Sequence, residues 1–320
     1  MISFSIVICC YNSSSKIVKT LDSILNQKKA DKIKYEVIII NNASTDNTEL
    51  VVNEYICRYD IHARLINEYK SGLIFARKAG VEAAKNVITV FVDDDNILDD
   101  NYFEVLNDIF KKKKDIDFIG GASRLPDDYH VPDWFYKNSK SYAVGDQYNI
   151  NRYLEKGEVL WGAGIAVRTK YLKNIFSKEF ICIGRTSTIQ LAGDDSEICY
   201  RLHLLNAKGY YLSTLKLVHN IAVDRISYEK LINMKIGFGA SSPYLLLYKN
   251  LFSNKKSIKG SILNNHFCIG IILYIRLGMA KINNDRLLCA FYKGAINGFS
   301  NKLLYKRAKK IISSLEFNEI

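Results

Sequence analysis

Residues 87–96 read Val-Ile-Thr-Val-Phe-Val-Asp-Asp-Asp-Asn, and this stretch decides the fold. Its first six residues are apolar or β-branched without interruption, which is typical of a strand covered on both faces of a parallel sheet. Three adjacent carboxylates then follow, and burying them without a cation would be costly because they repel one another. At the carboxyl end of a strand such acids form a hard-oxygen site suited to Mg²⁺ or Mn²⁺. The alternative is an acidic turn that leads into the next helix.

Three more strand-like runs precede this stretch, and helical segments separate them. Residues 4–9 and 35–40 are short, apolar and rich in β-branched side chains, and residues 63–66 form a weaker third run. The intervening segments carry apolar residues at helical spacing, and the first of them has a natural N-cap in the serine cluster 13–15. This alternating order predicts a doubly wound α/β sheet with right-handed crossovers, whose ligands bind beyond the carboxyl ends of the strands.

The pattern becomes mixed after residue 99 and mainly helical after Arg225. The expected elements are a helix over 101–112, strands over 117–121 and 215–218, an apolar segment over 160–167 that leads into a short strand over 165–168, and helices over 228–237, 244–251, 268–280, 286–300 and 304–315. The sequence therefore predicts an α/β domain over residues 1–225, followed by a helical region over residues 226–320 that contacts the acceptor, a membrane surface or another copy of the chain.

The composition is that of a folded protein with a sizeable core, since 48% of the 320 residues are hydrophobic and 24% are charged. The formal net charge is +12 and the sequence pI is about 9.2, so anionic partners are attracted. Much of the excess lies in the second half of the chain, as in Lys255, Lys256 and Lys259, then Lys302, Lys306, Arg307, Lys309 and Lys310. A solvated basic face would explain it equally well. Because no zinc-finger or RNP-like motif occurs, nucleic acid is not an expected partner.

The seven cysteines are an odd number and include no C-x-x-C pair, which favours a reducing compartment over a disulfide framework or a zinc site. The chain begins directly with an apolar strand and shows no signal-peptide pattern. The apolar run 267–280 contains Arg276 and is too short to span a bilayer. We therefore expect a cytoplasmic protein, with the membrane surface as an alternative location.

Five segments together resemble the family 2 glycosyltransferases, which are inverting enzymes with a GT-A fold. They are Ser5-Ile6-Val7-Ile8-Cys9-Cys10-Tyr11-Asn12, Val37-Ile38-Ile39-Ile40-Asn41-Asn42-Ala43-Ser44-Thr45-Asp46, Gly72-Leu73-Ile74-Phe75-Ala76-Arg77-Lys78-Ala79-Gly80, Val92-Asp93-Asp94-Asp95 and Ala192-Gly193-Asp194-Asp195-Ser196-Glu197. Each segment is loose alone, but the ordered set is specific and covers roughly residues 4–225. The resemblance implies a GT-A Rossmann-like sheet, parallel or mixed, with flanking helices, and a nucleotide-sugar donor.

The resemblance assigns the donor site to the ends of the first strands. Cys9, Tyr11 and Asn42 would surround the nucleotide base, with Tyr11 as a stacking face. Arg77 would reach the base edge or the diphosphate, although pairing with a surface carboxylate is an alternative.

The acid segment would hold the ribose and the metal. Alternation along an extended segment would point Asp93 and Asp95 the same way and Asp94 the other, while Asp94 still counts among the donor-binding residues. Asp93 would bind the ribose and share with Asp95 the divalent metal, which neutralises charge on the departing nucleoside diphosphate. His219 matches a position where relatives often carry a histidine near the metal, although a lone histidine is more often structural.

The base site departs from the family in one respect. The family usually has an Asp-Asp pair where this chain has Asn41-Asn42. An asparagine carbonyl still accepts a hydrogen bond from a uracil or thymine imide, but its amide also donates. A UDP-sugar is the first choice of donor on this basis, and the base remains open.

The resemblance also implies an acceptor side. Transfer with inversion needs a carboxylate that removes the proton of the attacking hydroxyl, and Asp195 is the expected base. Asp194 and Glu197 are nearby alternatives that would also contact the acceptor, unless these acids only favour a helix N-terminus. Trp161 and Gly162 would line the sugar pocket, although a structural turn with a core tryptophan explains them equally well.

The expected function is transfer of a sugar from a nucleotide sugar to an acceptor hydroxyl, in the assembly of bacterial capsule, O-antigen or exopolysaccharide. The acceptor would be a saccharide or a lipid-diphosphate-linked saccharide. A nucleotidyltransferase is the first alternative, but the segment after the first strand lacks the expected Gly-rich signature with Arg and Lys. A degenerate, non-catalytic scaffold is the second, and only the asparagine pair supports it. The apolar run 267–274, with lysines nearby, would touch an anionic membrane, pack as a core helix or form a dimer interface.

Overall fold

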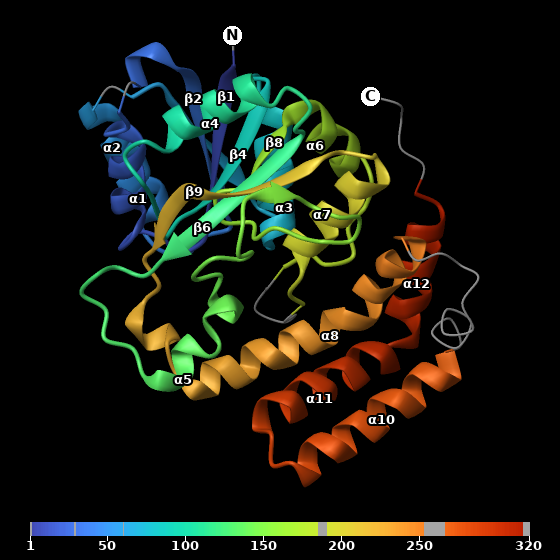
Figure 1. The fold of residues 1–320 in the computed structure, drawn as a ribbon. Coiled ribbons are helices and arrows are strands. Elements are labelled where there is room, and N and C mark those ends of the chain that lie inside the picture. The colour runs from blue at the N-terminus through green and yellow to red at the C-terminus, as the bar shows by residue number, and fades with distance from the viewer. Residues whose placement is uncertain (1, 29, 60, 185–190, 253–265, 316–320) are drawn as a thin grey trace.

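A mixed β-sheet forms the centre of the computed structural model, which describes residues 2–28, 30–59, 61–184, 191–252 and 266–315 (Figure 1). The strands are β1 (Ser3–Cys10), β2 (Lys34–Asn42), β3 (Ala63–Glu68), β4 (Ile88–Asp93), β5 (Asn96–Leu98), β6 (Phe118–Arg124), β7 (Arg152–Tyr153), β8 (Ala166–Arg168) and β9 (Gly209–His219). Their order is β3-β2-β1-β4-β8-β6-β9-β5, with β7 paired to β9. The four predicted N-terminal strands are confirmed as parallel neighbours, because β1 pairs with both β2 and β4, and β2 pairs with β3.

The second half of the sheet is mixed. β8 is antiparallel to β4 and β6, β9 runs parallel to β6, and the short β5 is antiparallel to β9. The short strand predicted over 165–168 is confirmed as β8, whereas residues 160–164 before it form no strand. A turn precedes it, in which the Ile165 N–H donates to the Gly162 carbonyl and Gly164 has a φ of +74°.

Helices cover both faces of the sheet. The helical elements are α1 (Ile17–Leu25), η1 (Ala30–Lys32), α2 (Thr48–Tyr59), α3 (Leu73–Ala83), α4 (Tyr102–Lys112), α5 (Asp133–Tyr136), η2 (Ser139–Tyr142), α6 (Thr169–Phe176), α7 (Asp194–Leu204), η3 (Val223–Arg225), α8 (Tyr228–Phe252), α10 (His266–Ile282), α11 (Arg286–Ser300) and α12 (Lys302–Ser313). Alternate residues of β1 explain the two layers: Ile6 and Ile8 join the core under α1, α2 and α4, whereas Val7 joins the core under α3, α6 and α7. The predicted α/β architecture is confirmed.

The start of α1 corrects one expectation. The serine cluster was expected to cap the helix, but α1 begins at Ile17 and its N-cap, Lys16, makes no side-chain capping bond. The Ser13 hydroxyl instead contacts the Asp94 carboxylate and accepts from the backbone N–H of Tyr11. The serines therefore link the first helix to the acid segment.

The C-terminal region is helical, and two predicted helices are one. Residues 228–237 and 244–251 belong to α8, which continues through Pro243. Proline lacks the N–H that the Gly239 carbonyl would accept, but the Ser242 hydroxyl donates to that carbonyl at 2.8 Å. Figure 1 shows α11 between α8 and α10, so that α10 is the outermost helix of this region.

Among the residues that the structure describes, no helix is both long and apolar enough to cross a membrane. The basic residues Lys255, Lys256 and Lys259 lie outside the described residues, as do the side chains of Phe267 and Cys268. The division into residues 1–225 and 226–320 stays a prediction. The two regions share apolar clusters, one of which combines Tyr200 of α7 with Tyr244 and Tyr248 of α8.

Candidate active site

Two adjoining hollows lie at the carboxyl ends of the parallel strands. The smaller, of about 480 Å³, is called the strand-end pocket and is lined by residues that follow β1, β2 and β4. The larger, of about 830 Å³, is called the long cleft and extends from Trp161 and Asp195 along α8 to α10 and α11. Asp93, His219 and Arg225 line both hollows, so the two meet at the acid segment.

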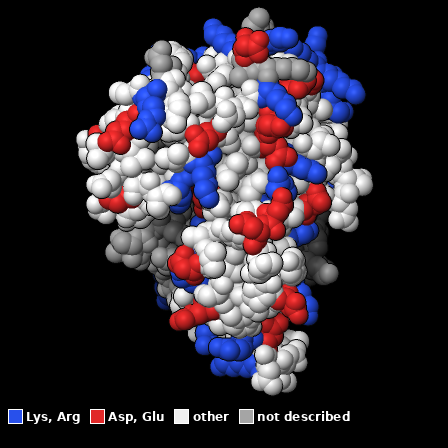
Figure 2. Space-filling view, turned by 90° about the vertical axis from the view of Figure 1, so that its left-hand side faces the viewer, with Lys and Arg blue, Asp and Glu red and all other residues white. Residues whose placement is uncertain are grey.

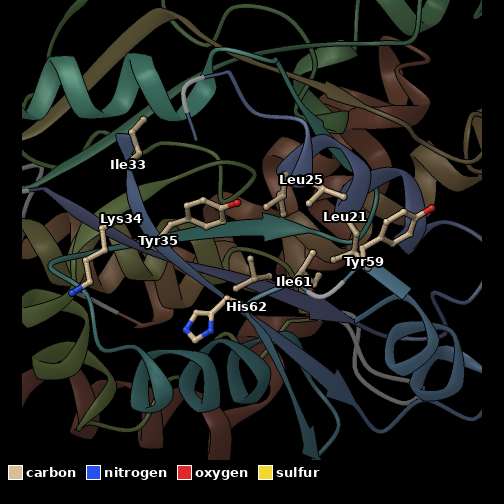
Figure 3. Close-up of a pocket in the computed structure, with 10 residues that line it drawn as sticks. Leu21, Leu25, Ile33, Lys34, Tyr35, Tyr59, Ile61 and His62 are labelled. Atoms are coloured by element: carbon tan, nitrogen blue, oxygen red, sulfur yellow. The ribbon is translucent and has the colours of Figure 1, made fainter. Parts of the chain in front are cut away.

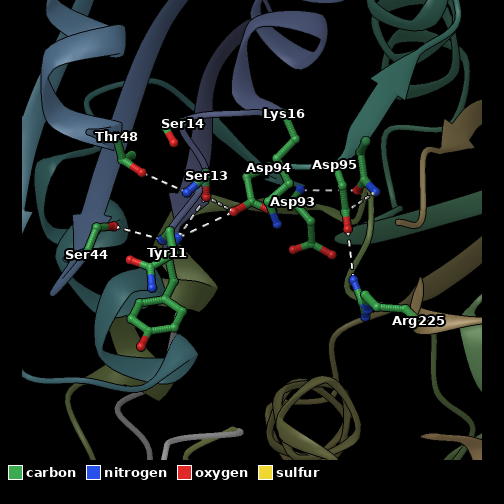
Figure 4. A network of polar contacts seen from close by, with 12 residues as sticks. Tyr11, Ser13, Ser14, Lys16, Ser44, Thr48, Asp93, Asp94, Asp95 and Arg225 are labelled. Atoms are coloured by element: carbon green, nitrogen blue, oxygen red, sulfur yellow. Dashed lines mark hydrogen bonds and ion pairs between the residues drawn. The ribbon is translucent and has the colours of Figure 1, made fainter. Parts of the chain in front are cut away.

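The three acids of the segment point in two directions (Figure 4). β4 ends at Asp93 and a turn follows, so the segment is not extended as the alternation argument assumed. Asp94 nevertheless turns toward α1, where it contacts the Ser13 hydroxyl and forms an ion pair of 2.7 Å with Lys16. Asp95 turns the other way, toward Arg225, with 3.0 Å between Oδ2 and Nη1. Asp94 is therefore held by α1, and Asp93 and Asp95 remain beside the two hollows.

The electrostatics of Asp93 and Asp95 differ. Burial raises the pKa of Asp95, but the neighbouring His219, Lys16 and Arg225 outweigh burial and lower it to about 2. Burial also raises the pKa of Asp93, and the charges of Asp95 and Asp195 add to this against the lowering effect of Arg77. The site thus gathers more negative charge than its own cations neutralise.

His219 lies beside Asp95, as the sequence predicted. Its Nδ1 is 2.9 Å from the Tyr142 carbonyl, which only accepts hydrogen bonds, so Nδ1 carries a hydrogen. Its Nε2 is therefore the atom that faces Asp95, with 3.5 Å to Oδ1. A cation that binds the Nε2 lone pair together with the Asp95 carboxylate fits this donor set.

No three His, Cys, Asp or Glu side chains form a preassembled metal cage in the described part of the chain. A hard cation such as Mg²⁺ keeps several waters and is often held by one or two carboxylates together with substrate phosphates. Asp95, with Asp93 and His219 beside it, fits that kind of site.

The position of Arg77 corrects its predicted role. Only 1% of Arg77 is exposed, and it lines neither hollow. Its Nη1 donates to Asp194 at 2.7 Å and to Asp195 at 2.6 Å, while its Nη2 is 4.0 Å from Asp93. Arg77 therefore does not face the strand-end pocket. It pairs instead with the buried Asp194 and the partly exposed Asp195, which agrees in part with the alternative of a carboxylate partner.

Asp194 and Asp195 begin α7, which follows Gly193 with its φ of +94°. Burial raises the pKa of Asp194, and the charge of Asp195 adds to it, although Arg77 opposes both. Asp195 is the more accessible of the two, since 36% of its side chain is exposed against 12% for Asp194. The structure thus places both acids in the long cleft, with Asp195 facing the solvent.

The loop with Trp161 and Gly162 fixes Asp195 from the other side. The backbone N–H of Gly162 donates to Asp195 Oδ2 at 2.9 Å. A Cβ at position 162 would overlap both the Asp195 carboxylate and the Arg77 guanidinium. Trp161 is half-buried and lines the long cleft, as expected of an acceptor contact.

Glu197 is a wrong prediction. Its side chain is completely buried and faces away from the cleft. The carboxylate accepts from the backbone N–H groups of Ile181 and Cys182, from Arg201 and from the Tyr248 hydroxyl. It is a structural acid that links α7 to α8, because a buried carboxylate needs this many donors.

The predicted base-contact residues line the strand-end pocket. Tyr11 is 53% exposed, whereas Cys9 is buried, and burial raises the pKa of its thiol to about 12. Asn42 donates to the Glu68 carbonyl at 3.2 Å and the Lys70 carbonyl at 2.8 Å, and its oxygen accepts from the Gly72 N–H at 2.9 Å. Both amide hydrogens are thus used, and the carbonyl oxygen is the only part of this side chain left for a ligand.

Two contributions to the site escaped the sequence analysis. Lys16 brings a cation to the strand-end pocket, although the preceding serines suggested only a helix cap. Ser241, Leu245 and Lys249 of α8 line the long cleft, so the C-terminal region forms a wall of the site. Acceptor contacts were expected of this region as a whole, but these residues were not identified, because helical periodicity reveals the apolar face of a helix and not its neighbour.

A third hollow, of about 380 Å³, lies away from the acids (Figure 3). Its lining includes Leu21, Tyr35 and Ile61, near the amino ends of β2 and β3. It contains no acid and lies opposite the strand ends where α/β sheets bind their ligands. On the face in Figure 2, acidic and basic side chains are interspersed, without a continuous basic band of the kind that nucleic acid would need.

Comparison with known proteins identifies the family. The sequence model described as "Glycosyl transferase family 2" matches residues 5–176, more than half of the chain. The chain belongs to glycosyltransferase family 2. The match contains β1 to β4 and the acid segment, and the family assignment agrees with the resemblance seen in the sequence.

Curated members of family 2 are similar over part of their length. The "Uncharacterized glycosyltransferase EpsJ" of Bacillus subtilis is 28% identical over 179 residues, which are 55% of this chain and 44% of EpsJ. The "Poly-beta-1,6-N-acetyl-D-glucosamine synthase" of Staphylococcus epidermidis is 29% identical over 122 residues, which are 38% of this chain and 28% of the synthase. These matches span less than half of the relatives' own length.

Solved glycosyltransferase structures have the same fold. The S. aureus TarS 1–349 structure in complex with UDP-GlcNAc has a TM-score of 0.53 at 15% identity, covering 98% of this chain and 92% of that one. The mannosyltransferase PcManGT from Pyrobaculum calidifontis, in complex with GDP-Man and Mn²⁺, has a TM-score of 0.54 at 16% identity, covering 96% and 86%. At these identities the likeness shows the fold alone.

Proposed function

We propose that this chain transfers a sugar, with inversion, from a nucleoside-diphosphate sugar to an acceptor hydroxyl. The observation that carries the proposal is the meeting of the strand-end pocket and the long cleft at Asp93, with Asp95 at one side and Asp195 at the other. A donor in the pocket and an acceptor in the cleft would bring the anomeric carbon and the attacking hydroxyl to this junction. The similarity to family 2 relatives supports the reaction class.

The donor base would lie against Tyr11 in the strand-end pocket. The free lone pair of the Asn42 oxygen accepts from the imide N–H of uracil or thymine, whereas its committed amide has no hydrogen to give. A UDP-sugar is therefore the proposed donor, in agreement with the UDP-GlcNAc bound to the TarS structure.

The diphosphate would lie at the junction, where Lys16 and Arg225 supply positive charge. Asp95 would hold a divalent cation, Mn²⁺ or Mg²⁺, with Asp93 and His219 beside it, and Asp93 would also contact the ribose. When bound, the cation neutralises charge on the departing nucleoside diphosphate. The Mn²⁺ in the PcManGT structure supports a metal in this fold.

Asp195 would be the general base. As the acceptor oxygen bonds to the anomeric carbon, the bond from that carbon to the diphosphate oxygen breaks and the hydroxyl proton passes to Asp195. Arg77 and the Gly162 N–H hold this carboxylate in place through two hydrogen bonds. The acids Asp93, Asp95 and Asp195 are all present at the junction, which argues against a degenerate scaffold.

The acceptor would be a saccharide or a lipid-diphosphate-linked saccharide that stacks on Trp161 and contacts Asp194. Gly162 is buried and lines neither hollow, so its part is to hold Asp195 and not to contact the acceptor. The name of the Staphylococcus epidermidis relative supports a place in bacterial surface-polysaccharide assembly. Trp161 offers an apolar platform for a sugar face at the acid end of the long cleft.

A thermal-shift screen tests this proposal. The purified chain is heated with UDP-, GDP-, dTDP- and CMP-sugars, with Mn²⁺ and with EDTA. A ligand that binds only the folded state stabilises it by about 2.7 kcal/mol when its concentration is about a hundred times Kd. This stabilisation raises the melting temperature. We expect a Mn²⁺-dependent shift with UDP-sugars. A shift with none of the donors would favour the scaffold.

A further inference from the structure

The outer face of α10 is an exposed apolar stripe. Residues at helical spacing along it share this face, and their exposed fractions run from 45% to 81%. They are Ile271, Tyr274, Ile275, Met279 and Ile282, with Gly278 between them. The opposite side of α10 packs inward through buried Ile269 and Ala280. This helix is therefore apolar on both sides, which is unusual for a surface helix in water.

Charge is arranged around the stripe and not within it. Arg276 and Lys281 are exposed and lie on opposite flanks of α10, between the apolar stripe and the buried side. Residues 266–284 include no Asp or Glu, so the fixed charge of this helix is entirely positive. Figure 2 shows Lys and Arg side chains at the lower end of the molecule, with Asp and Glu side chains beside them.

This arrangement favours an anionic surface over a second copy of the chain. Two copies joined through the stripe would bring Arg276 and Lys281 close to their equivalents, with no acid on the helix to pair with them. The net charge of +12 adds to that repulsion. An anionic bilayer offers apolar chains to the stripe and negative headgroups to both flanks.

The flank that carries Arg276 also lines the far end of the long cleft, together with Leu273 and Tyr292. A membrane against the stripe would thus lie beside the opening of the cleft whose other end holds Asp195. We propose that α10 docks on an anionic bilayer surface through Ile271, Tyr274, Ile275, Met279 and Ile282. Docking in this position would let the enzyme take an acceptor from the membrane plane, an inference that rests on the proposed function.

Vesicle co-sedimentation of the full chain tests the docking without any donor or acceptor. The vesicles are pure phosphatidylcholine, or phosphatidylcholine with phosphatidylglycerol. The variant carries Ile275→Asp and Met279→Asp, and the matched control is Leu50→Asp, which changes another exposed apolar residue on α2. We expect wild type and control to bind only the anionic vesicles. The double variant should bind at least about tenfold more weakly, because two apolar side chains no longer enter the interface.

Three results would overturn the proposal: no binding of the wild type, equal binding of the double variant, or binding that ignores the anionic lipid. A dimer in sedimentation velocity that the double variant disrupts, without vesicle binding, would assign the stripe to a second copy instead. The melting temperature of each variant checks that it folds. Donor binding measured on the same samples reports the proposed function separately, since Ile275 and Met279 line neither the strand-end pocket nor the long cleft.

Discussion

Replacing Asn42 with aspartate should destabilise this chain, although the family usually carries an acid there. Asn42 is 5% exposed, and its amide donates to two backbone carbonyls, those of Glu68 and Lys70. Asn42→Asp removes both donors and turns a carboxylate toward the two carbonyls. Each lost hydrogen bond costs about 1 kcal/mol, and a largely buried carboxylate that faces two carbonyl oxygens adds about 1–3 kcal/mol. The expected loss is therefore about 3–5 kcal/mol of unfolding free energy.

Urea unfolding followed by circular dichroism measures this loss, and Asn41→Asp is the matched control. The Asn41 amide donates to the side-chain oxygen of Asn67, at 2.9 Å. The Asn67 amide can rotate and donate to a carboxylate at position 41, but it then gives up its 3.1 Å hydrogen bond to the exposed Glu49. One hydrogen bond thus replaces another, and Asn41→Asp should cost only about 1 kcal/mol. If Asn42→Asp unfolds at the same urea concentration as the wild type, the two amide hydrogen bonds are not formed. The argument that only the Asn42 oxygen reads the base would then fail.

Three further changes follow from the described contacts. Gly162→Ala should displace Asp195 and lower turnover at least about a hundredfold, as measured by the release of nucleoside diphosphate. Donor affinity, measured by calorimetry, should stay within about threefold of the wild type. Unchanged turnover would contradict this. Gly294→Ala should lose about 1–3 kcal/mol in urea unfolding, because its Cβ overlaps a backbone carbonyl of α8, whereas Gly278→Ala, which meets no atom, should be neutral or stabilising. For Glu36, burial raises the pKa, but the hydrogen bonds that its carboxylate accepts lower it below its usual range. The charged carboxylate therefore stabilises the fold fully above the unfolded pKa of about 4.3, and this stabilisation is lost as pH falls through the folded pKa. The stability advantage of wild type over Glu36→Gln should shrink toward about pH 3, and a constant difference would exclude this linkage.

The sequence predicted the parallel half of the sheet well, because continuous β-branched runs such as residues 35–40 have few alternatives to a buried strand. Prediction from the sequence was less accurate where the pairing of a strand depends on residues far away in the chain. The short strand β8 was predicted, but its antiparallel pairing with β4 and β6 was not, and the turn before it depends on Gly164. The continuation of α8 through Pro243 depends on a serine hydroxyl that replaces the missing donor, which a proline rule does not anticipate.

The site residues were likewise predicted well where local motifs place them and poorly where distant segments pack together. Asp95 and His219 were expected together and lie together, because His219 ends β9 and pairs there with Asn96 of β5, the residue next to Asp95. Glu197 and Arg77 were misplaced because motif spacing does not tell which side of a helix is buried. The wall that α8 adds to the cleft comes from packing between segments far apart in the chain, for which a single sequence holds no signal.

The assignment of Asp95 to the donor side and Asp195 to the acceptor side is tested most directly by the donor affinity of two variants. Calorimetric titration of a UDP-sugar with Mn²⁺ is compared for wild type, Asp95→Asn and Asp195→Asn. We predict that Asp195→Asn binds within about threefold of the wild type, because this acid acts on the acceptor. Asp95→Asn should bind at least about tenfold more weakly, because it loses a ligand of the cation that holds the diphosphate. Weak binding by Asp195→Asn with unchanged binding by Asp95→Asn would contradict the assignment of donor and acceptor sides.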